Sequence, residues 1–178
     1  MRDPRPSRTI HWLSEAFEVR AVCSGNGPLA NATRVPLPLP QGPLWARKLR
    51  GALQLKLRRF DVRLWPAGYR ELAAQERARE PEFIVVHGLA LLPFALAIRG
   101  ANARVFFVAR EYYPGHFEDR WFWRFFLREF NRHLCRAYLH QADIMVTVNQ
   151  GLAEAYRQEY SVPCGVLPSF PGPVDLSP

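Results

Sequence analysis

Short apolar runs alternate with longer stretches of helical periodicity along most of this chain. Three of the runs are continuous and rich in β-branched or aromatic residues, at 83–86 (FIVV), 104–108 (RVFFV) and 144–148 (IMVTV). They are too short for helices, and such runs are typical of strands buried on both faces of a parallel sheet. Because strands that alternate with helices form β-α-β units, we predict an α/β fold, a Rossmann-like parallel sheet with helices on both faces.

The remaining elements follow from the same periodicities. Further strands are predicted at 17–23, 62–65 and 165–167, and helices at 7–15, 44–60, 69–79, 89–98, 121–141 and 151–160. Pro36, Pro38 and Pro40 alternate with leucine, which indicates an extended surface loop. In the 44–60 helix the apolar residues recur at helical spacing, so we expect a basic outer face.

The length and composition fit one ordinary globular domain. The chain has 178 residues, of which 48% are hydrophobic and 22% charged, a balance that excludes an intrinsically disordered protein. No run reaches the roughly 18 apolar residues of a transmembrane helix, and the start lacks the apolar region of a signal peptide. The sequence has an odd number of cysteines, Cys23, Cys135 and Cys164, and none of them has C-x-x-C spacing. This pattern argues against disulfides and against a cysteine zinc site. These features predict a cytoplasmic location.

A strong basic excess is the first pointer to a partner. The net charge is +8, and Lys48 and Lys56 are the only lysines among 24 basic residues. Such a charge favours an anionic partner, which could be nucleic acid, membrane lipid or a phosphorylated substrate. The alternative is that arginine replaces lysine on ordinary solvated faces, since net charge bears on association rather than on fold.

Polar side chains stand where the three continuous strands end. In parallel α/β sheets, ligands bind beyond the carboxyl ends of the strands. His87 and Gly88 follow the FIVV strand, and His87 could serve as a general base or hydrogen-bond partner, or be purely structural. Arg110 and Glu111 follow the RVFFV strand, where they could hold a sugar hydroxyl or a phosphate, or form a surface ion pair. Asn149 follows the IMVTV strand.

Several well-known chemical signatures are absent from the sequence. It has no G-x-G-x-x-G dinucleotide fingerprint, no P-loop and no G-x-S-x-G nucleophile elbow. His133 and His140 lack a third ligand nearby, so no metal is expected. The stretch 121–138 has a wide aromatic face interleaved with arginines, which is either core or a surface for a membrane or a partner.

Four segments stand in a distinctive order along the chain. The first segment is residues 3–5 (DPR), followed by a predicted helix and the EVRAV strand. The second is FIVVHGLALLP and the third is RVFFVAREYYPG. The fourth is ADIMVTVNQGLA, which leads to VLPSFP. In this order and spacing they resemble the N-terminal domain of retaining family 4-type glycosyltransferases, which have the GT-B fold of two Rossmann-like domains. In that family the corresponding strands end in His-Asp, with Leu-Pro beyond, and in Asp-x-His-Glu-aromatic-aromatic-Pro.

The resemblance implies transfer of a sugar from a nucleotide-sugar donor to a glycan or lipid-linked acceptor bound by this domain. His87 falls on the family histidine that faces the transfer site, and Glu111 on the glutamate of the His-Glu pair, so both are candidate catalytic residues. Candidate acceptor-binding residues are Asp3, Arg5, Gly88, Arg110, Tyr112, His116 and Asn149. The nucleotide sugar is expected as a co-substrate, with no other cofactor and no metal.

The chain departs from the family pattern at several positions. Gly88 stands where aspartate is usual, Val108 and Arg110 where aspartate and histidine are usual, and Ser169 where asparagine is usual. These changes leave the identity of the acceptor open, and they leave room for a divergent or degenerate site.

Two larger parts of the family fold lie outside the segments that match. The family's first strand would precede Asp3, which leaves one position of the predicted sheet empty, either as a weakness or as a place for a partner. We expect 1–167 to form the acceptor-side half of a GT-B fold, and the Pro-rich 168–178 to begin the linker to a C-terminal donor domain. That domain, or a partner chain, would hold the nucleotide, so the chain alone is expected to be inactive.

A second hypothesis comes from the charge rather than from the resemblance. The +8 charge and the arginine-aromatic stretch could make the chain a non-catalytic basic binding module for anionic lipid or nucleic acid. The transferase hypothesis makes nucleic acid an unlikely partner and allows a peripheral position at an anionic membrane surface. An epimerase on the same two-domain fold has no separate support.

Overall fold

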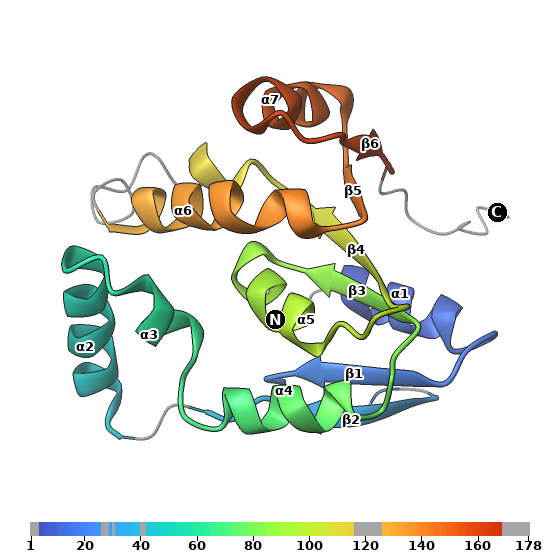
Figure 1. Ribbon diagram of the computed structural model, residues 1–178, viewed down its shortest axis with the longest axis horizontal. Coiled ribbons are helices and arrows are strands. Elements are labelled where there is room, and N and C mark those ends of the chain that lie inside the picture. The colour runs from blue at the N-terminus through green and yellow to red at the C-terminus, as the bar shows by residue number, and fades with distance from the viewer. Residues whose placement is uncertain (1–3, 26–28, 30, 40–41, 116–125, 169–178) are drawn as a thin grey trace, which may run out of the picture.

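Two parallel sheets flanked by helices make up the protein in a computed structural model (Figure 1). The structure describes residues 4–25, 29, 31–39, 42–115 and 126–168. The larger sheet has the strand order β3-β4-β5-β6, and the smaller one pairs β1 with β2. The predicted α/β class with Rossmann-like parallel strands is therefore confirmed.

The four-stranded sheet is built from the apolar runs that predicted it. Its strands are β3 (Phe83–His87), β4 (Arg104–Ala109), β5 (Ile144–Thr147) and β6 (Gly165–Val166). The register places Phe83 opposite Arg104, and Phe106 opposite Ile144. Each strand moves one place across the sheet in the same direction, and all pairs are parallel. Right-handed crossovers then place the connecting helices on one face.

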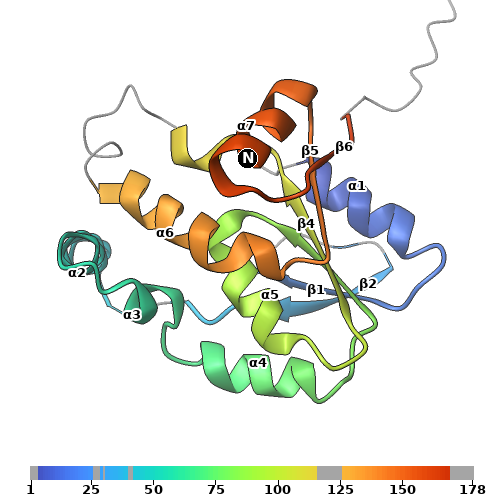
Figure 2. The ribbon, with the colours of Figure 1, turned by 45° about the horizontal axis from the view of Figure 1, so that its top comes forward.

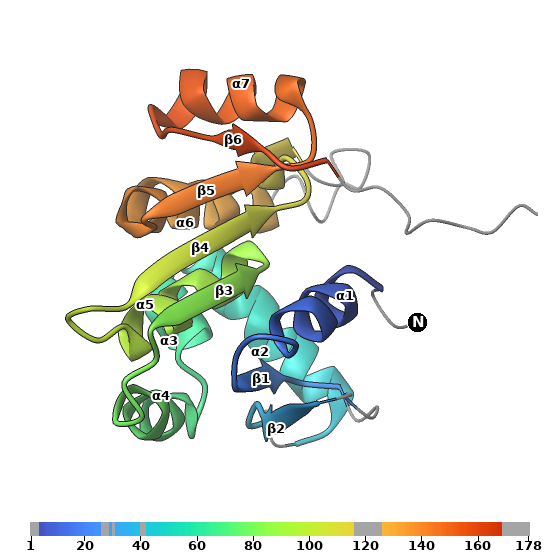
Figure 3. The same cartoon turned by 90° about the vertical axis from the view of Figure 1, so that its right-hand side faces the viewer.

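Helices cover the two faces of the sheet unequally. The crossovers contain α5 (Leu92–Ile98), α6 (Arg128–Tyr138) and α7 (Gln150–Tyr160), with short 3-10 turns at Leu89–Leu91, Tyr113–Gly115 and Leu139–Gln141. Figure 3 shows α5 and α6 behind the strands and α1 (Pro4–Leu13) in front of them. The side chains of the strands show the same asymmetry. Val105 and Phe107 are fully buried on the helix-covered face, whereas Phe83 is 52% exposed on the other. Helices therefore lie on both faces as predicted, but the strands are buried more completely on one face than on the other.

A half-buried carboxylate fixes the amino-terminal ends of β4 and β5. Asp143 accepts a hydrogen bond from the backbone N–H of Val105 at 2.8 Å. The same side chain pairs with Arg104 at 2.9 Å and with Arg99 at 3.2 Å. The Val105 hydrogen bond and the two guanidinium groups hold the pKa of Asp143 below its usual value. This clamp therefore stays charged at neutral pH and orders the start of both strands.

The smaller sheet is a separate pair of strands beside the larger one. It comprises β1 (Val19–Cys23) and β2 (Ala32–Pro36), which run parallel in continuous register. In Figures 1 and 3, β1 is the next strand after β3, but no ladder hydrogen bonds join the two. The smaller sheet instead meets its neighbours through side chains, and Phe17, two residues before β1, contacts the Phe83 ring with centroids 5.9 Å apart.

Three helices connect β2 to β3, and one of them corrects a local prediction. They are α2 (Leu44–Lys56), α3 (Phe60–Leu64) and α4 (Tyr69–Arg77). The predicted strand at 62–65 is α3, because its apolar residues Phe60 and Leu64 recur at helical spacing and pack toward the core. Residues 37–39 of the proline-rich segment are in a loop as predicted, and only its first proline, Pro36, belongs to a strand, as the last residue of β2. An edge strand tolerates proline there because no ladder partner lies on its outer side.

Candidate functional site

The candidate site lies beyond the carboxyl ends of β3 and β4. His87 is the last residue of β3, and its backbone is in register with Val108 of β4. Arg110 and Glu111 follow Val108 within three residues, so the ends of both strands bring these side chains to the same edge of the sheet. This is the edge at which parallel α/β sheets bind their ligands.

The imidazole of His87 is the most distinctive group at this edge. The residue is half-buried, and both of its ring nitrogens are shielded from solvent. Neither nitrogen has a hydrogen-bond partner among the residues that the structure describes. Burial lowers the pKa of His87 below its ordinary value of 6.5, so the ring is neutral at physiological pH. A neutral imidazole with two unused nitrogens can donate one hydrogen bond and accept another.

Gly88 turns the chain away from the sheet directly after His87. Its backbone has φ 112° and ψ 129°, a conformation that strongly favours glycine. The Gly88 carbonyl accepts a hydrogen bond from the N–H of Leu91 at 3.1 Å, which begins the short helical turn at Leu89–Leu91. The position predicted to bind an acceptor therefore has a backbone role that alone explains its residue type.

Two buried side chains hold the backbone around Glu111. The hydroxyl of Tyr156, on α7, donates to the Glu111 carbonyl at 2.9 Å and accepts from the Tyr113 N–H at 3.1 Å. The side-chain amide of Asn131, on α6, donates to the Tyr113 carbonyl at 2.8 Å. Tyr156 is fully buried and Asn131 is 7% exposed. The loop after β4 is thus fixed from the core side by the helices on either side of β5, which gives Arg110 and Glu111 a rigid support.

Tyr113 connects the ends of β3 and β4. Burial raises the pKa of the Tyr113 phenol to about 12, and the charge of Glu111 adds to the shift. The backbone N–H of Leu89 and the guanidinium of Arg110 both interact with this hydroxyl and oppose the shift. The phenol therefore remains protonated at neutral pH and bridges the turn after His87 to the loop that carries Arg110.

Tyr112 turns toward α7 rather than standing free. Its hydroxyl is hydrogen-bonded to the carboxylate of Glu159, and its ring meets that of Tyr156 with centroids 5.2 Å apart. Burial and the Glu159 carboxylate raise the pKa of Tyr112. The residue predicted to contact an acceptor is therefore engaged in a structural hydrogen bond in this state.

The other predicted acceptor-binding residues are distributed differently. Asn149 is the N-cap of α7, and its side-chain oxygen accepts the N–H of Leu152 at 2.9 Å. Arg5 lies in the first turn of α1, whereas Asp3 and His116 lie outside the described residues. Most of the aromatic stretch predicted at 121–138 falls within α6, and residues 121–125 also lie outside the described residues.

The sequence did not predict the buried polar residues that hold the backbone of the site in place. Tyr156 and Asn131 sit on α7 and α6, where an inward-facing polar group resembles ordinary helix surface in the sequence. Thr147, at the end of β5, is 1% exposed, and its hydroxyl has no hydrogen-bond partner within the described part of the chain. The only sequence signal for these residues is a polar atom at an otherwise apolar position of a helix or strand.

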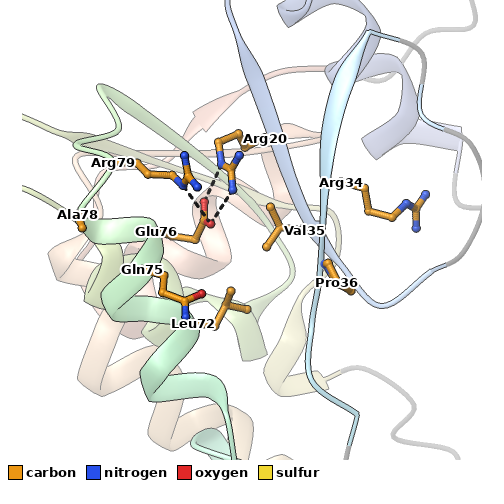
Figure 4. A pocket seen from close by; sticks show the side chains of 9 residues that line it. All are labelled: Arg20, Arg34, Val35, Pro36, Leu72, Gln75, Glu76, Ala78 and Arg79. Atoms are coloured by element: carbon orange, nitrogen blue, oxygen red, sulfur yellow. Dashed lines mark hydrogen bonds and ion pairs between the residues drawn. The ribbon is translucent and has the colours of Figure 1, made fainter.

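A hollow of about 690 Å³ lies between the small sheet and α4, away from His87 (Figure 4). Arg20 on β1 donates two hydrogen bonds to Glu76 on α4, at 2.8 and 2.9 Å, and Arg79 lies 3.7 Å from the same carboxylate. Arg34 also lines the hollow, but its guanidinium points away from Glu76. Because the Arg20–Glu76 pair satisfies its own charges, we assign it to attachment of the small sheet rather than to catalysis.

The described residues hold no group of three or more His, Cys, Asp or Glu side chains that could bind a metal ion. Within the same ranges, no helix has the length and apolar character needed to cross a membrane. The chemistry available at the His87 edge is therefore that of an imidazole, a carboxylate, a guanidinium and phenols. Such groups bind hydroxyls and phosphates and transfer protons.

The fold and this edge define the chain as an α/β protein of Rossmann-like architecture. Comparisons with known proteins take the identification no further, because no protein-family model, no curated protein and no solved structure matches the chain. The likeness to glycosyltransferases therefore rests on the strand-end motifs alone, and the function below is inferred from them and from the geometry.

Proposed function

We propose that this chain is the acceptor-side half of a glycosyltransferase that takes a sugar from a nucleotide-sugar donor. The observation that carries the proposal is the neutral imidazole of His87 at the carboxyl edge of a parallel sheet, where its two nitrogens have no partner among the described residues. A buried polar group without a partner is costly, so it indicates a ligand that completes the hydrogen bonding.

In this proposal the described residues bind and orient the acceptor, a glycan or a lipid-linked sugar. His87 accepts or donates a hydrogen bond at an acceptor hydroxyl, and Glu111, from the same edge of the sheet, accepts a second one. Arg110 supplies positive charge at the same edge. The locked backbone at 111–113 keeps these groups in place, which is what a positioning site needs.

The donor side of the reaction requires groups from elsewhere. Stabilisation of a leaving diphosphate needs donors or cations aimed at it. We therefore propose that a C-terminal domain or a partner chain binds the nucleotide sugar, with 1–167 as one Rossmann-like half of a GT-B enzyme. A cytoplasmic position at a membrane surface follows in this proposal if the acceptor is lipid-linked.

Nucleotide release by protein purified from its source cells, together with whatever co-purifies, tests the proposal. Uridine- and guanosine-diphosphate sugars are supplied as donors. His87→Ala is expected to lower release by about tenfold or more, because it removes a group that acts at the reacting hydroxyl. His140→Ala changes an exposed histidine in the short turn after α6, so it is the matched control and should leave release unchanged.

Either of two results would overturn the proposal. Unchanged release in His87→Ala, with the urea unfolding midpoint also unchanged, would remove His87 from the mechanism. No release from any sugar nucleotide by the wild-type material would favour the second candidate, a non-catalytic basic binding module. A basic, apolar surface on α2 favours anionic lipid over nucleic acid for that module.

A further inference from the structure

Helix α2 carries a row of large apolar side chains that face solvent. Trp45 is 70% exposed, Leu49 65%, Leu53 53% and Leu57, which caps the helix, 55%. The sequence periodicity predicted that this row would face the core, yet the buried residue of the helix is Leu55. Exposed apolar residues are ordinary when scattered, but a continuous row on one helix marks an interaction surface.

The spacing gives the row a definite shape. The four residues recur every fourth position, so successive side chains are rotated by about 40° and together span an arc of about 120°. Leu55 points to the opposite side, toward the core cluster. Figures 1 and 2 show α2 at the margin of the molecule, with α3 as its neighbour, so the arc faces outward from the fold. Val62, on α3, extends the exposed apolar surface and is 55% exposed.

The charged side chains of residues 42–60 are all positive, and one of them, Arg58, lies 3.9 Å from Glu129 on α6. Between Gly42 and Phe60 the sequence contains no aspartate or glutamate. It contains six basic residues, all exposed: Arg47, Lys48, Arg50, Lys56, Arg58 and Arg59. Long basic side chains beside an apolar row can extend their charges to lipid headgroups while the row enters the bilayer.

We propose that α2 is an interfacial helix that docks this protein on an anionic lipid bilayer. The row of Trp45, Leu49, Leu53 and Leu57 would enter the boundary between headgroups and acyl chains, and the basic residues would pair with lipid phosphates. Nucleic acid would use the basic residues but leave the leucines in water. A bilayer is the partner that uses both features. The docking surface lies on a different element from His87, so the proposal holds whether or not the chain is a glycosyltransferase.

Co-sedimentation with lipid vesicles tests the proposal. Vesicles of phosphatidylcholine containing about 30% phosphatidylglycerol should bind the protein at low salt, and pure phosphatidylcholine should bind it at least about tenfold more weakly. Trp45→Ser should lower the partition coefficient on the anionic vesicles by about tenfold. Trp12→Ser is the matched control, because Trp12 is 61% exposed on α1, and it should bind like the wild type.

Fluorescence distinguishes insertion from loose attraction. Tryptophan emission should move to shorter wavelength on addition of the anionic vesicles, as Trp45 leaves water. Trp45→Phe keeps an aromatic side chain in the row, so it should retain vesicle binding and lose most of this shift. Binding without any shift in the wild type would contradict insertion.

A second pair of variants tests the contribution of the basic residues to vesicle binding. Lys48→Gln with Arg50→Gln should weaken anionic-vesicle binding by about tenfold, since each basic group near the surface contributes to the attraction. Arg77→Gln with Arg136→Gln removes two exposed charges elsewhere and should have a much smaller effect.

Three results would overturn the proposal: no binding to anionic vesicles, binding unaffected by the α2 variants, or a wild-type dimer that Leu49→Glu converts to a monomer.

Discussion

The two sheets of this protein differ in how much apolar burial holds them in place. The four-stranded sheet has a fully buried face that includes Val105 and Phe107, and it belongs to one continuous apolar core. The buried residues in or next to the β1–β2 pair are Ala21, Val35 and Leu37, and they lie outside that core cluster. The small sheet contacts the core through the partly buried Val22, and the ion pair between Arg20 and Glu76 joins it to α4.

This difference indicates which part of the fold resists changes in pH and salt. Apolar burial is insensitive to pH and salt, whereas a partly buried ion pair depends on the charge state of both partners. The His87 edge is built on the large sheet, so its geometry should survive conditions that loosen β1 and β2. Regions with few buried apolar contacts open first, so the β1–β2 pair should have the lower local stability.

The largest expected effect tests the apolar side of this comparison. Phe107→Ala removes a fully buried ring from β4 and should lower the free energy of unfolding by about 3 to 5 kcal/mol. Phe106→Ala, the adjacent residue on the half-exposed face, should cost about 1 kcal/mol. Urea denaturation measures both values. Equal losses would mean that the two faces of the sheet are buried alike, contrary to the structure.

The polar side of the comparison predicts a smaller and more local effect. Glu76→Gln leaves Arg20 beside an uncharged amide, and should destabilise the small sheet by about 2 kcal/mol. Hydrogen exchange should accelerate at β1 amides and stay unchanged at β4. Glu71→Gln, an exposed acid on the same helix, is the control and should alter neither region. Uniform acceleration across both sheets would show that they unfold as one unit.

Lowering the pH should destabilise the small sheet more than the large one. The hydrogen bond from Arg20 holds the pKa of Glu76 below its ordinary value of 4.5. The unfolded chain therefore takes up the proton first, so the contribution of Glu76 is complete above about pH 4.5 and is lost as the pH falls toward the folded-state pKa. Exchange at β1 should accelerate over this range in the wild type. The Glu76→Gln variant should lack this component, and an identical acid response would contradict the assignment.

The smallest predicted effect concerns a helix packed on the large sheet. Asn149→Ala removes the N-cap of α7 and should cost about 1 kcal/mol, while Asn149→Ser should restore most of it. The stability of both variants follows from thermal unfolding. If Asn149→Ala leaves stability unchanged, capping does not explain this asparagine, and a role in binding becomes the better reading.

Most of the large sheet could be predicted from the sequence. FIVV, RVFFV and IMVTV are short, apolar and separated by helical stretches, and each forms a strand of the expected parallel type. β2 was missed because Pro36 and its neighbours suggest a loop, and proline is tolerated at an edge. The unequal burial of the two faces of the sheet was also missed, because an apolar run does not reveal what covers it.

The site was predictable only in part. A polar residue after a buried strand directs attention to His87, Arg110 and Glu111, since strand ends share an edge. The sequence could not show that Tyr156 would lock the loop after β4, because that contact joins residues 45 positions apart. It also misjudged α2, whose periodicity is helical but whose apolar row faces solvent, because periodicity defines a face and not its orientation.

The pKa of the His87 imidazole is the quantity to measure first. Nitrogen-detected NMR of the histidine rings over a pH titration reports the pKa and the tautomer of each. The account predicts that His87 titrates below 6.5, because the ring is buried and has no carboxylate partner among the described residues. It would then be neutral and available to a sugar hydroxyl at neutral pH. A pKa above 6.5 would show an ion-paired, structural histidine and would contradict the proposed site.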